Sequence, residues 1–328
     1  MIRTILSASV ALTLAGCNMA AEAELDIPEV EDGVLSQETM VDVTRTLSTD
    51  EFGGRMPGTD GETRTVAFLI EKFKAAGLQP GNGESWVQQV PLVEITGKDF
   101  APLTITGGES DLSFESRKDW VGVTYREDAS TTLADSELVF VGYGVNAPER
   151  GWNDYEGLDM KGKTAVILVN DPDFGAETLE GDFNGKAMTY YGRWAYKFEE
   201  AARRGALGAL VIHDNAAAGY GWNVASSSPG ESYAGEPAPG ATPSVLLQGW
   251  LHERAAVELM DSSGFDLAQL KVKARSAEFQ AFELPDVRLT TNQKVSLERI
   301  DSKNVLARLS GSRCDAETIM VSAHWDAY

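Results

Sequence analysis

Residues 318–328, TIMVSAHWDAY, combine a short apolar run with a His-x-Asp pair. The run from Ile319 to Ala323 has the length and composition of a strand, which would place the pair at the strand's C-terminal tip. Strand tips in α/β sheets are common binding positions for ligands and metals, because the sheet holds them rigidly. His324 could bind a divalent metal through one imidazole nitrogen while the Asp326 carboxylate holds the other. The alternative is a solvent-exposed histidine beside a turn, because a two-residue motif has little specificity by itself.

The first residues have the features of a targeting segment. An apolar run over 5–14 is too short to cross a bilayer, and Leu14-Ala15-Gly16-Cys17 resembles a bacterial lipobox. We therefore expect residues 1–17 to be a lipoprotein signal peptide, with Cys17 lipidated; an ordinary secretory signal with an incidental cysteine is the alternative. By resemblance to Gram-negative lipoproteins, Asn18 favours the outer membrane, facing the periplasm or the cell exterior. Residues 18–33 are rich in Ala, Glu, Asp and Pro and suit a flexible tether.

The composition is that of a globular protein and argues against nucleic-acid partners. Of 328 residues, 43% are hydrophobic and 24% are charged, and this length allows two domains with their own cores. The 50 acidic and 28 basic residues give a formal net charge of -22. Nucleic-acid binding needs a basic surface, so this charge argues against it. The two cysteines are Cys17 and Cys314, so no intrachain disulfide is available once Cys17 carries lipid.

Helical patterns come first along the chain. Apolar residues recur at helical spacing from about Ser36 to Leu47 and from Val66 to Ala76, where Gly77 is placed to end the second helix. Strand patterns dominate afterwards. Short apolar runs predict strands over 138–141, 165–169, 209–212, 304–309 and 319–323, while residues 272–295 alternate. Further helices are predicted over 194–204 and 252–260, and a long loop over 216–243. The predicted fold is α/β, with a mixed sheet flanked by helices and interrupted by an inserted β-rich domain.

Two glycine-rich motifs imitate nucleotide-binding sites. Residues 157–164, GLDMKGKT, match the pattern of a phosphate-binding loop, but a strand follows Thr164 where a helix N-terminus is needed. Residues 142–147, GYGVNA, follow a strand but lead to Pro148 and not to a helix. Both are predicted to be turns, so no nucleotide partner is expected.

An aromatic run covers residues 188–197, MTYYGRWAYK. Core packing is the expected role of Trp194 and Tyr196, whereas Tyr190, Tyr191 and Arg193 are candidates for facing a substrate cleft. His213 and His252 are interpreted as surface or capping residues and not as metal ligands.

Three pieces of the chain carry a family resemblance when they are taken together. The first runs from LSTDEFGGRMPGT at 47–59 into FKAAGLQP at 73–80. The second is VFVGYG at 139–144 with WNDY at 152–155, KGK at 161–163 and FEEAARRGA at 198–206, and the third is NVLA at 304–307 leading to SAHWD at 322–326. Together they resemble the co-catalytic zinc aminopeptidases of metallopeptidase family 28. The second piece resembles the protease-associated domain that this family often carries as an insertion.

The resemblance implies a phosphorylase/hydrolase-like fold and a site with two zinc ions. His324 matches the family's first zinc ligand, and Asp326 matches the carboxylate that orients it and is counted with the catalytic residues. The implied reaction is hydrolysis of N-terminal peptide bonds in peptide substrates by a metal-activated water, with a glutamate as general base. The domains implied are a peptidase domain over 34–98 and 286–328, with the protease-associated domain inserted at 99–285.

The family's other ligands and its general base lie downstream of the His-x-Asp pair. We therefore expect this chain to be an N-terminal part of the enzyme, inactive and without tight zinc binding by itself, because catalytic zinc needs about three protein ligands. The reading frame after Tyr328 distinguishes this hypothesis from a non-catalytic envelope lipoprotein that binds peptides or proteins on the same scaffold. A glutaminyl cyclase-like acyl transferase is a third hypothesis, which the inserted domain disfavours.

Overall fold

The computed structural model describes residues 36–227, 230–311 and 317–327. Cys17, with the predicted signal peptide and tether, and Cys314 lie outside these ranges. The chain divides into two units, residues 1–49 and 50–328. Among the helices of the described ranges, none has the length and apolar character needed to cross a bilayer.

The described part of the first unit is the helix α1, Gln37–Leu47. Its N-terminus is capped by Ser36, whose hydroxyl accepts a hydrogen bond from the backbone N–H of Thr39 at 3.1 Å. The helix predicted from Ser36 is confirmed.

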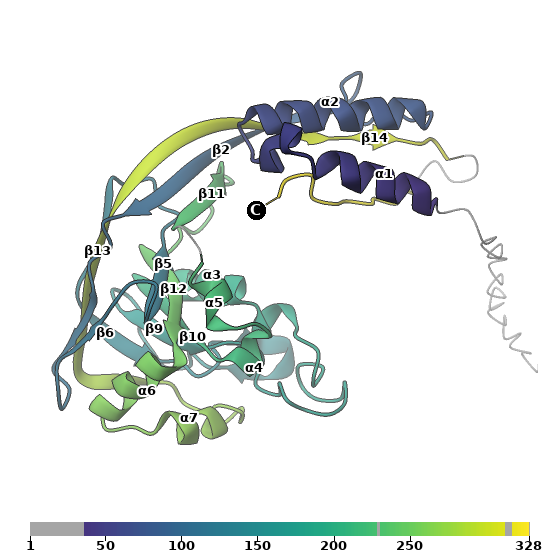
Figure 1. Cartoon of the computed structure of the whole chain (residues 1–328). Helices are drawn as coiled ribbons and strands as arrows, with labels where there is room; N and C mark the ends of the chain where they lie inside the picture. The colour runs from purple at the N-terminus through teal and green to yellow at the C-terminus, as the bar shows by residue number, and fades with distance from the viewer. Residues whose placement is uncertain (1–35, 228–229, 312–316, 328) are drawn as a thin grey trace, which may run out of the picture. The chain divides into compact units, whose positions relative to one another are not determined.

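The second unit starts with helices and continues with strands (Figure 1). Its helices are η1 (Asp50–Arg55), α2 (Asp60–Ala75), η2 (Pro148–Arg150), η3 (Tyr190–Gly192), α3 (Trp194–Arg203), α4 (Asn215–Ala218), α5 (Trp222–Ala225), α6 (Glu253–Ser262) and α7 (Leu267–Lys273). Its strands are β1 (Gln79–Pro80), β2 (Val87–Lys98), β3 (Leu103–Thr106), β4 (Leu112–Phe114), β5 (Trp120–Val123), β6 (Ser130–Phe140), β7 (Asn146–Ala147), β8 (Trp152–Asn153), β9 (Thr164–Leu168), β10 (Gly208–His213), β11 (Glu231–Gly235), β12 (Leu247–His252), β13 (Phe282–Val305) and β14 (Ala307–Arg308).

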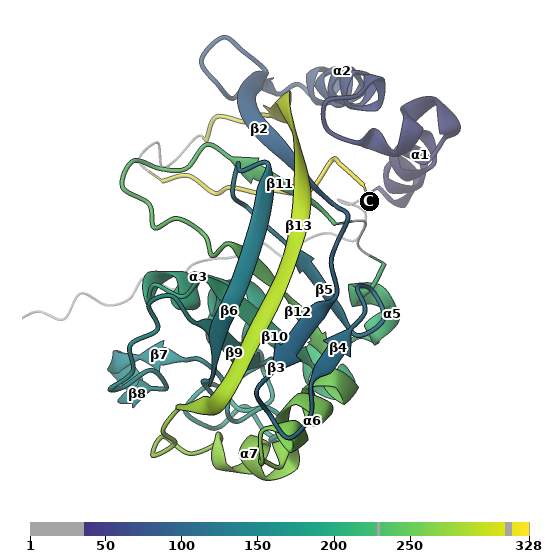
Figure 2. The ribbon, with the colours of Figure 1, turned by 90° about the vertical axis from the view of Figure 1, so that its left-hand side faces the viewer.

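A ten-stranded mixed sheet contains most of these strands (Figure 2). Its order is β11-β2-β13-β6-β9-β10-β12-β5, with β3 paired to β13 and β4 paired to β3. The four strands β6, β9, β10 and β12 run parallel to one another, and the other pairs are antiparallel. The prediction of a mixed sheet flanked by helices is confirmed.

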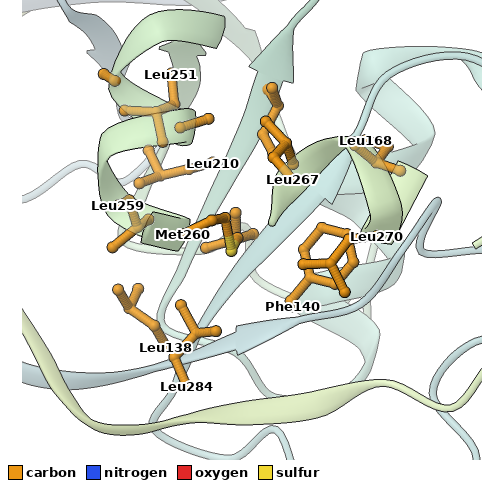
Figure 3. Close-up of a cluster of buried hydrophobic side chains, with 14 of the residues drawn as sticks. Leu138, Phe140, Leu168, Leu210, Leu251, Leu259, Met260, Leu267, Leu270 and Leu284 are labelled. Carbon is orange, nitrogen blue, oxygen red and sulfur yellow. The ribbon is translucent and has the colours of Figure 1, made fainter. Parts of the chain in front are cut away.

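The parallel strands are buried on both faces, as expected when helices cover both sides of a sheet. On one face, Leu138 and Phe140 of β6, Leu210 of β10 and Leu251 of β12 contact an apolar layer from α6 and α7 (Figure 3). That layer consists of Leu259, Met260, Leu267 and Leu270. On the other face, the alternate residues Val139, Ile167 and Val211 pack against Phe198 and Ala201 of α3. This alternation explains why continuous apolar runs at these positions correctly predicted strands.

The strand β13 joins the two halves of the sheet. Its first part pairs with β6 and β3, and its residues 294–305 pair with residues 87–98 of β2. The alternation over residues 272–295 therefore predicted a real strand but placed its start too early, because Leu267–Lys273 is the helix α7. The predicted loop over 216–243 contains the short elements α5 and β11.

The strand predicted over Ile319–Ala323 is wrong. Residues 317–327 have no regular secondary structure, and Ile319, Met320 and Val321 are 83–94% exposed. A strand needs a neighbour for its backbone hydrogen bonds, and no described strand pairs with this segment. Apolar composition alone therefore misled the prediction.

Both glycine-rich motifs are turns, as predicted. Thr164 is the first residue of the buried strand β9, so no helix N-terminus follows the GLDMKGKT motif. Gly142 and Gly144 have positive φ angles of 57° and 61°, and their segment leads into the short strand β7.

Candidate functional site

His324 and Asp326 form the polar pair that the sequence predicted, in an irregular segment instead of at a strand tip. Nδ1 of His324 lies 3.2 Å from Oδ1 of Asp326, and the histidine side chain is 89% exposed. In the tautomer that carries the proton on Nδ1, the ring donates to the carboxylate and Nε2 keeps a free lone pair. This is the orientation that a carboxylate imposes on a metal-binding histidine.

Hydrogen bonds to Trp325 fix the segment between these two residues. The indole Nε1 of Trp325 donates to the carbonyl oxygen of Lys303 on β13 at 2.9 Å. The carbonyl oxygen of Trp325 accepts from Nε of Arg55 at 3.0 Å. The glycine-rich segment around Arg55 and the His-x-Asp segment are thus neighbours in space, although each was identified separately in the sequence.

The glycine-rich segment has its own internal support. Gly53 and Gly54 adopt positive φ angles of 56° and 76° within η1, which explains the two consecutive glycines. The buried side chain of Glu62 on α2 accepts a hydrogen bond from the backbone N–H of Gly58 at 2.6 Å. Its other carboxylate oxygen lies 3.6 Å from Nζ of Lys303 on β13. These contacts connect α2, the loop before it and β13.

The described residues do not fit a complete zinc site. Zinc in proteins is held by three or four side chains, and a catalytic site needs at least three protein ligands. Within residues 36–227, 230–311 and 317–327, no group of three or more His, Cys, Asp or Glu side chains could hold a metal ion. His324 has one carboxylate beside it, and that carboxylate is engaged with the ring.

The aromatic run near residue 190 has a different arrangement from the predicted one. Tyr196 is 4% exposed, which confirms its predicted core position, but Trp194 is 42% exposed, so its predicted core position is wrong. The hydroxyl groups of Tyr190 and Tyr191 donate to Glu199 and Glu149 at 2.7 and 2.8 Å. Trp194 lies at the first turn of α3, where its side chain lines a surface pocket.

A buried charged cluster near the C-terminal ends of β6 and β9 escaped the sequence analysis. Lys197 of α3 is fully buried, and its Nζ donates to the carbonyl oxygens of Tyr143 and Asn170 at 2.5 and 3.0 Å. Burial lowers the pKa of Lys197, while the charges of Asp171 and Asp154 act in the opposite direction. Burial likewise raises the pKa of Asp154, which accepts hydrogen bonds from Val145 and Trp152. The sequence signal was indirect: Lys197 ends the aromatic run of residues 188–197 and is flanked by Tyr196 and Phe198, which are both buried.

The two other histidines have separate structural roles. His252 caps α6 by accepting a hydrogen bond at Nδ1 from the backbone N–H of Arg254, at 3.0 Å, so its predicted capping role is confirmed. The prediction of a surface or capping role for His213 is wrong, since this residue is 2% exposed. Its ring packs against three aromatic rings with centroids 5.2–5.4 Å away, those of Tyr220, Trp222 and Trp250. Residues of segment 220–222 thus cover His213 at the end of β10, and this cover accounts for its burial.

Comparisons with known proteins give weak structural matches. No family model matches the chain, and no curated protein matches it. Among solved structures, an aminopeptidase from Aneurinibacillus sp. strain AM-1 is 20% identical with a TM-score of 0.38. Two structures of BSAP, a zinc aminopeptidase from Bacillus subtilis, are 13% identical with TM-scores of 0.28 and 0.27. Each match covers 82% of this chain and 47% of the other, so the chain spans about half the length of these proteins. Likeness at these TM-scores carries no argument about the chemistry of this chain.

Proposed function

We propose that this chain is the N-terminal part of a zinc-dependent exopeptidase, an aminopeptidase that hydrolyses N-terminal peptide bonds of peptide substrates. In this proposal His324 is the first zinc ligand and Asp326 is the carboxylate that orients it. The other ligands and the general base follow residue 328 in the complete protein. When bound, zinc would supply an activated water and polarise the scissile carbonyl.

One observation carries the proposal: the Asp326 carboxylate lies 3.2 Å from Nδ1 of a histidine whose side chain is 89% exposed. A buried or fully hydrogen-bonded histidine would have a structural role, but here Nε2 remains available. The contacts of Trp325 with Lys303 and Arg55 hold the backbone between the pair, so it is presented from a fixed position. The sequence resemblance of the three separate pieces supports the same assignment.

The first test is the reading frame that follows the codon for Tyr328. Coding sequence with an aspartate soon after residue 324, a Glu-Glu pair, a further acidic residue and a histidine is the expected result. Absence of such donors, or a stop codon directly after Tyr328, would refute the hydrolase and favour a non-catalytic protein that binds peptides.

The second test uses the protein made from that complete frame, with leucine 4-nitroanilide as substrate. We expect hydrolysis that is lost with a chelator and restored by zinc. His324→Ala should remove the activity, and Asp326→Asn should lower activity or zinc affinity by roughly 10- to 100-fold, as loss of such a carboxylate does. His252→Asn is the matched control, because asparagine preserves the helix cap at a histidine that is not part of the proposed metal site. Full activity of His324→Ala would contradict the proposal.

We also propose that Cys17 carries lipid and anchors the protein to the outer membrane. Metabolic labelling with a radioactive fatty acid tests this directly. Label should enter the wild-type chain and not the Cys17→Ser variant, and equal labelling of both would disprove the anchor.

A further inference from the structure

A pocket of about 450 Å³ opens beside α3 and is not part of the proposed metal site. Its walls include Tyr125, Trp194, Phe198, Glu199, Arg203 and Gln248. This volume falls within the range of roughly 300–1,000 Å³ that is common for small-molecule sites. All six residues belong to the second unit, and they come from α3, from β12 and from the segment after β5.

The sheet explains why a pocket forms here. Phe198 and Ala201 of α3 pack over the face that Ala209 of β10 presents. Gln248 of β12 pairs in register with Ala209, so it continues the same face beyond the part that α3 covers. The helix and the uncovered part of the sheet therefore form two sides of one concavity.

Aromatic rings form its apolar wall. The Trp194 side chain is 42% exposed, whereas Phe198 beneath it is 5% exposed, and their ring centroids lie 5.8 Å apart. A tryptophan left so exposed on a helix that buries its other aromatic residues offers a large apolar surface to a ligand.

Gln248 supplies a hydrogen-bonding group within the pocket. This residue is 5% exposed as a whole, and its side chain lines the pocket. A carboxamide has two donor hydrogens and an acceptor oxygen, which match the C=O and N–H of a peptide group. Because Gln248 lines the pocket and its amide atoms are not among the fully buried polar atoms that lack a partner, the amide is accessible from the pocket and can bind a ligand there.

The charges at the rim compensate each other. Nη1 of Arg203 lies 3.6 Å from Oε2 of Glu199, and Nε of Arg203 donates to Oε2 of Glu200 at 2.7 Å. Since the acidic and basic groups are already paired, the pocket favours a ligand without net charge.

We propose that this pocket binds a short peptide, with an apolar side chain against Trp194 and a peptide group hydrogen-bonded to Gln248. The choice of a peptide over other neutral amides rests on the proposed function, but the site itself does not depend on zinc or on residues beyond 328. A binding measurement with this chain therefore tests the pocket separately from catalysis.

Isothermal titration calorimetry of the full chain with blocked tripeptides is the direct test. The probes are Ala-Leu-Ala and Ala-Gly-Ala, each acetylated at the N-terminus and amidated at the C-terminus. The leucine peptide should bind at least about tenfold more tightly, because burial of one leucine side chain is worth at least that factor. This comparison needs no variant protein.

Two substitutions locate the binding. Gln248→Leu keeps the side-chain size and removes the amide, and Trp194→Ala removes the exposed ring; each should weaken the leucine peptide by about tenfold. Gln269→Leu and Leu179→Ala are matched controls at exposed positions outside the pocket and should leave the affinity unchanged.

Three results with the blocked peptides would overturn the inference. They are no binding of the leucine peptide at millimolar concentration, equal binding of both peptides, or unchanged affinity in both pocket variants. Free leucine that binds as tightly as the blocked peptide would also overturn it, because the charged termini would then be recognised instead of the peptide group. Failure of peptide binding together with zinc-dependent hydrolysis by the complete protein would reject the pocket alone.

Discussion

Lys197→Met is the substitution whose effect on stability the structure defines best. Methionine keeps most of the length and apolar stem of lysine and removes the ammonium group. The carbonyl oxygens of Tyr143 and Asn170 then lose the donor that lies 2.5 and 3.0 Å away. Asp154 and Asp171 lose the positive charge that opposes the unfavourable burial of their carboxylates.

The magnitude follows from these losses. Each buried carbonyl that loses its partner costs about 1–3 kcal/mol, and removal of one member of a buried ion pair costs about 3–5 kcal/mol. The variant no longer buries an ammonium group, which offsets part of this loss. We expect a net destabilisation of about 3 kcal/mol, which corresponds to a decrease in Tm of roughly 6–12 °C for a unit of this size.

Differential scanning calorimetry of wild type, Lys197→Met, Asp154→Asn and the double variant provides the measurement. The double variant should lose less stability than the two single variants together, by about 1 kcal/mol or more, because neutralising both members leaves no uncompensated charge. Lys161→Met, at an exposed lysine, is the control and should change stability by less than about 0.5 kcal/mol. A decrease in Tm below about 2 °C for Lys197→Met would refute the role assigned to this cluster.

Two further predictions concern pH and backbone packing. Burial lowers the pKa of Lys197 from 10.5 to about 7, so between these pH values the unfolded chain binds more protons than the folded chain. The stability that this group contributes therefore increases as pH rises through that window and is lost as pH falls through 7. Urea titrations at pH 7 and 10 should show a larger stability of wild type relative to Lys197→Met at pH 10, and a constant or smaller difference would contradict the assignment. A Cβ at Gly249 in β12 would overlap the carbonyl oxygen of Val121 in β5, so Gly249→Ala should destabilise the protein by about 1–3 kcal/mol. The control is Gly235→Ala in β11, where a Cβ meets nothing within 4 Å, and it should change the urea midpoint little. Similar urea midpoints for the two variants would count against this packing.

The elements that the sequence predicted correctly are those with a strong local pattern. Residues 165–169 form an apolar run because β9 is buried on both faces, and α2 combines an apolar stripe with Gly77 at a φ angle of 77° just after its end. His252 lies immediately before the amphipathic helix α6 and caps it, a position that sequence analysis can recognise. In each case the information lies within about a dozen neighbouring residues.

The features that escaped prediction depend on distant partners. Arg55 and Trp325 are 270 positions apart, so nothing local indicates that one donates to the other. The apolar run at 319–323 has strand composition, but the pairing that would make it a strand is not present among the described residues. Trp194 was assigned to the core, yet its side chain is 42% exposed and lines the pocket together with Gln248 of β12, a residue 54 positions away.

The pairing of β2 with β13 has a consequence for biosynthesis. Its partners are about 200 residues apart in the chain, so the hydrogen bonds of β2 on that side can form only after most of the polypeptide has been made. At about 5–20 residues per second, the ribosome takes on the order of 10–40 s to produce the missing partner. During that interval the nascent β2 edge is open to wrong partners, and a holding chaperone that covers this edge should raise the yield of folded protein.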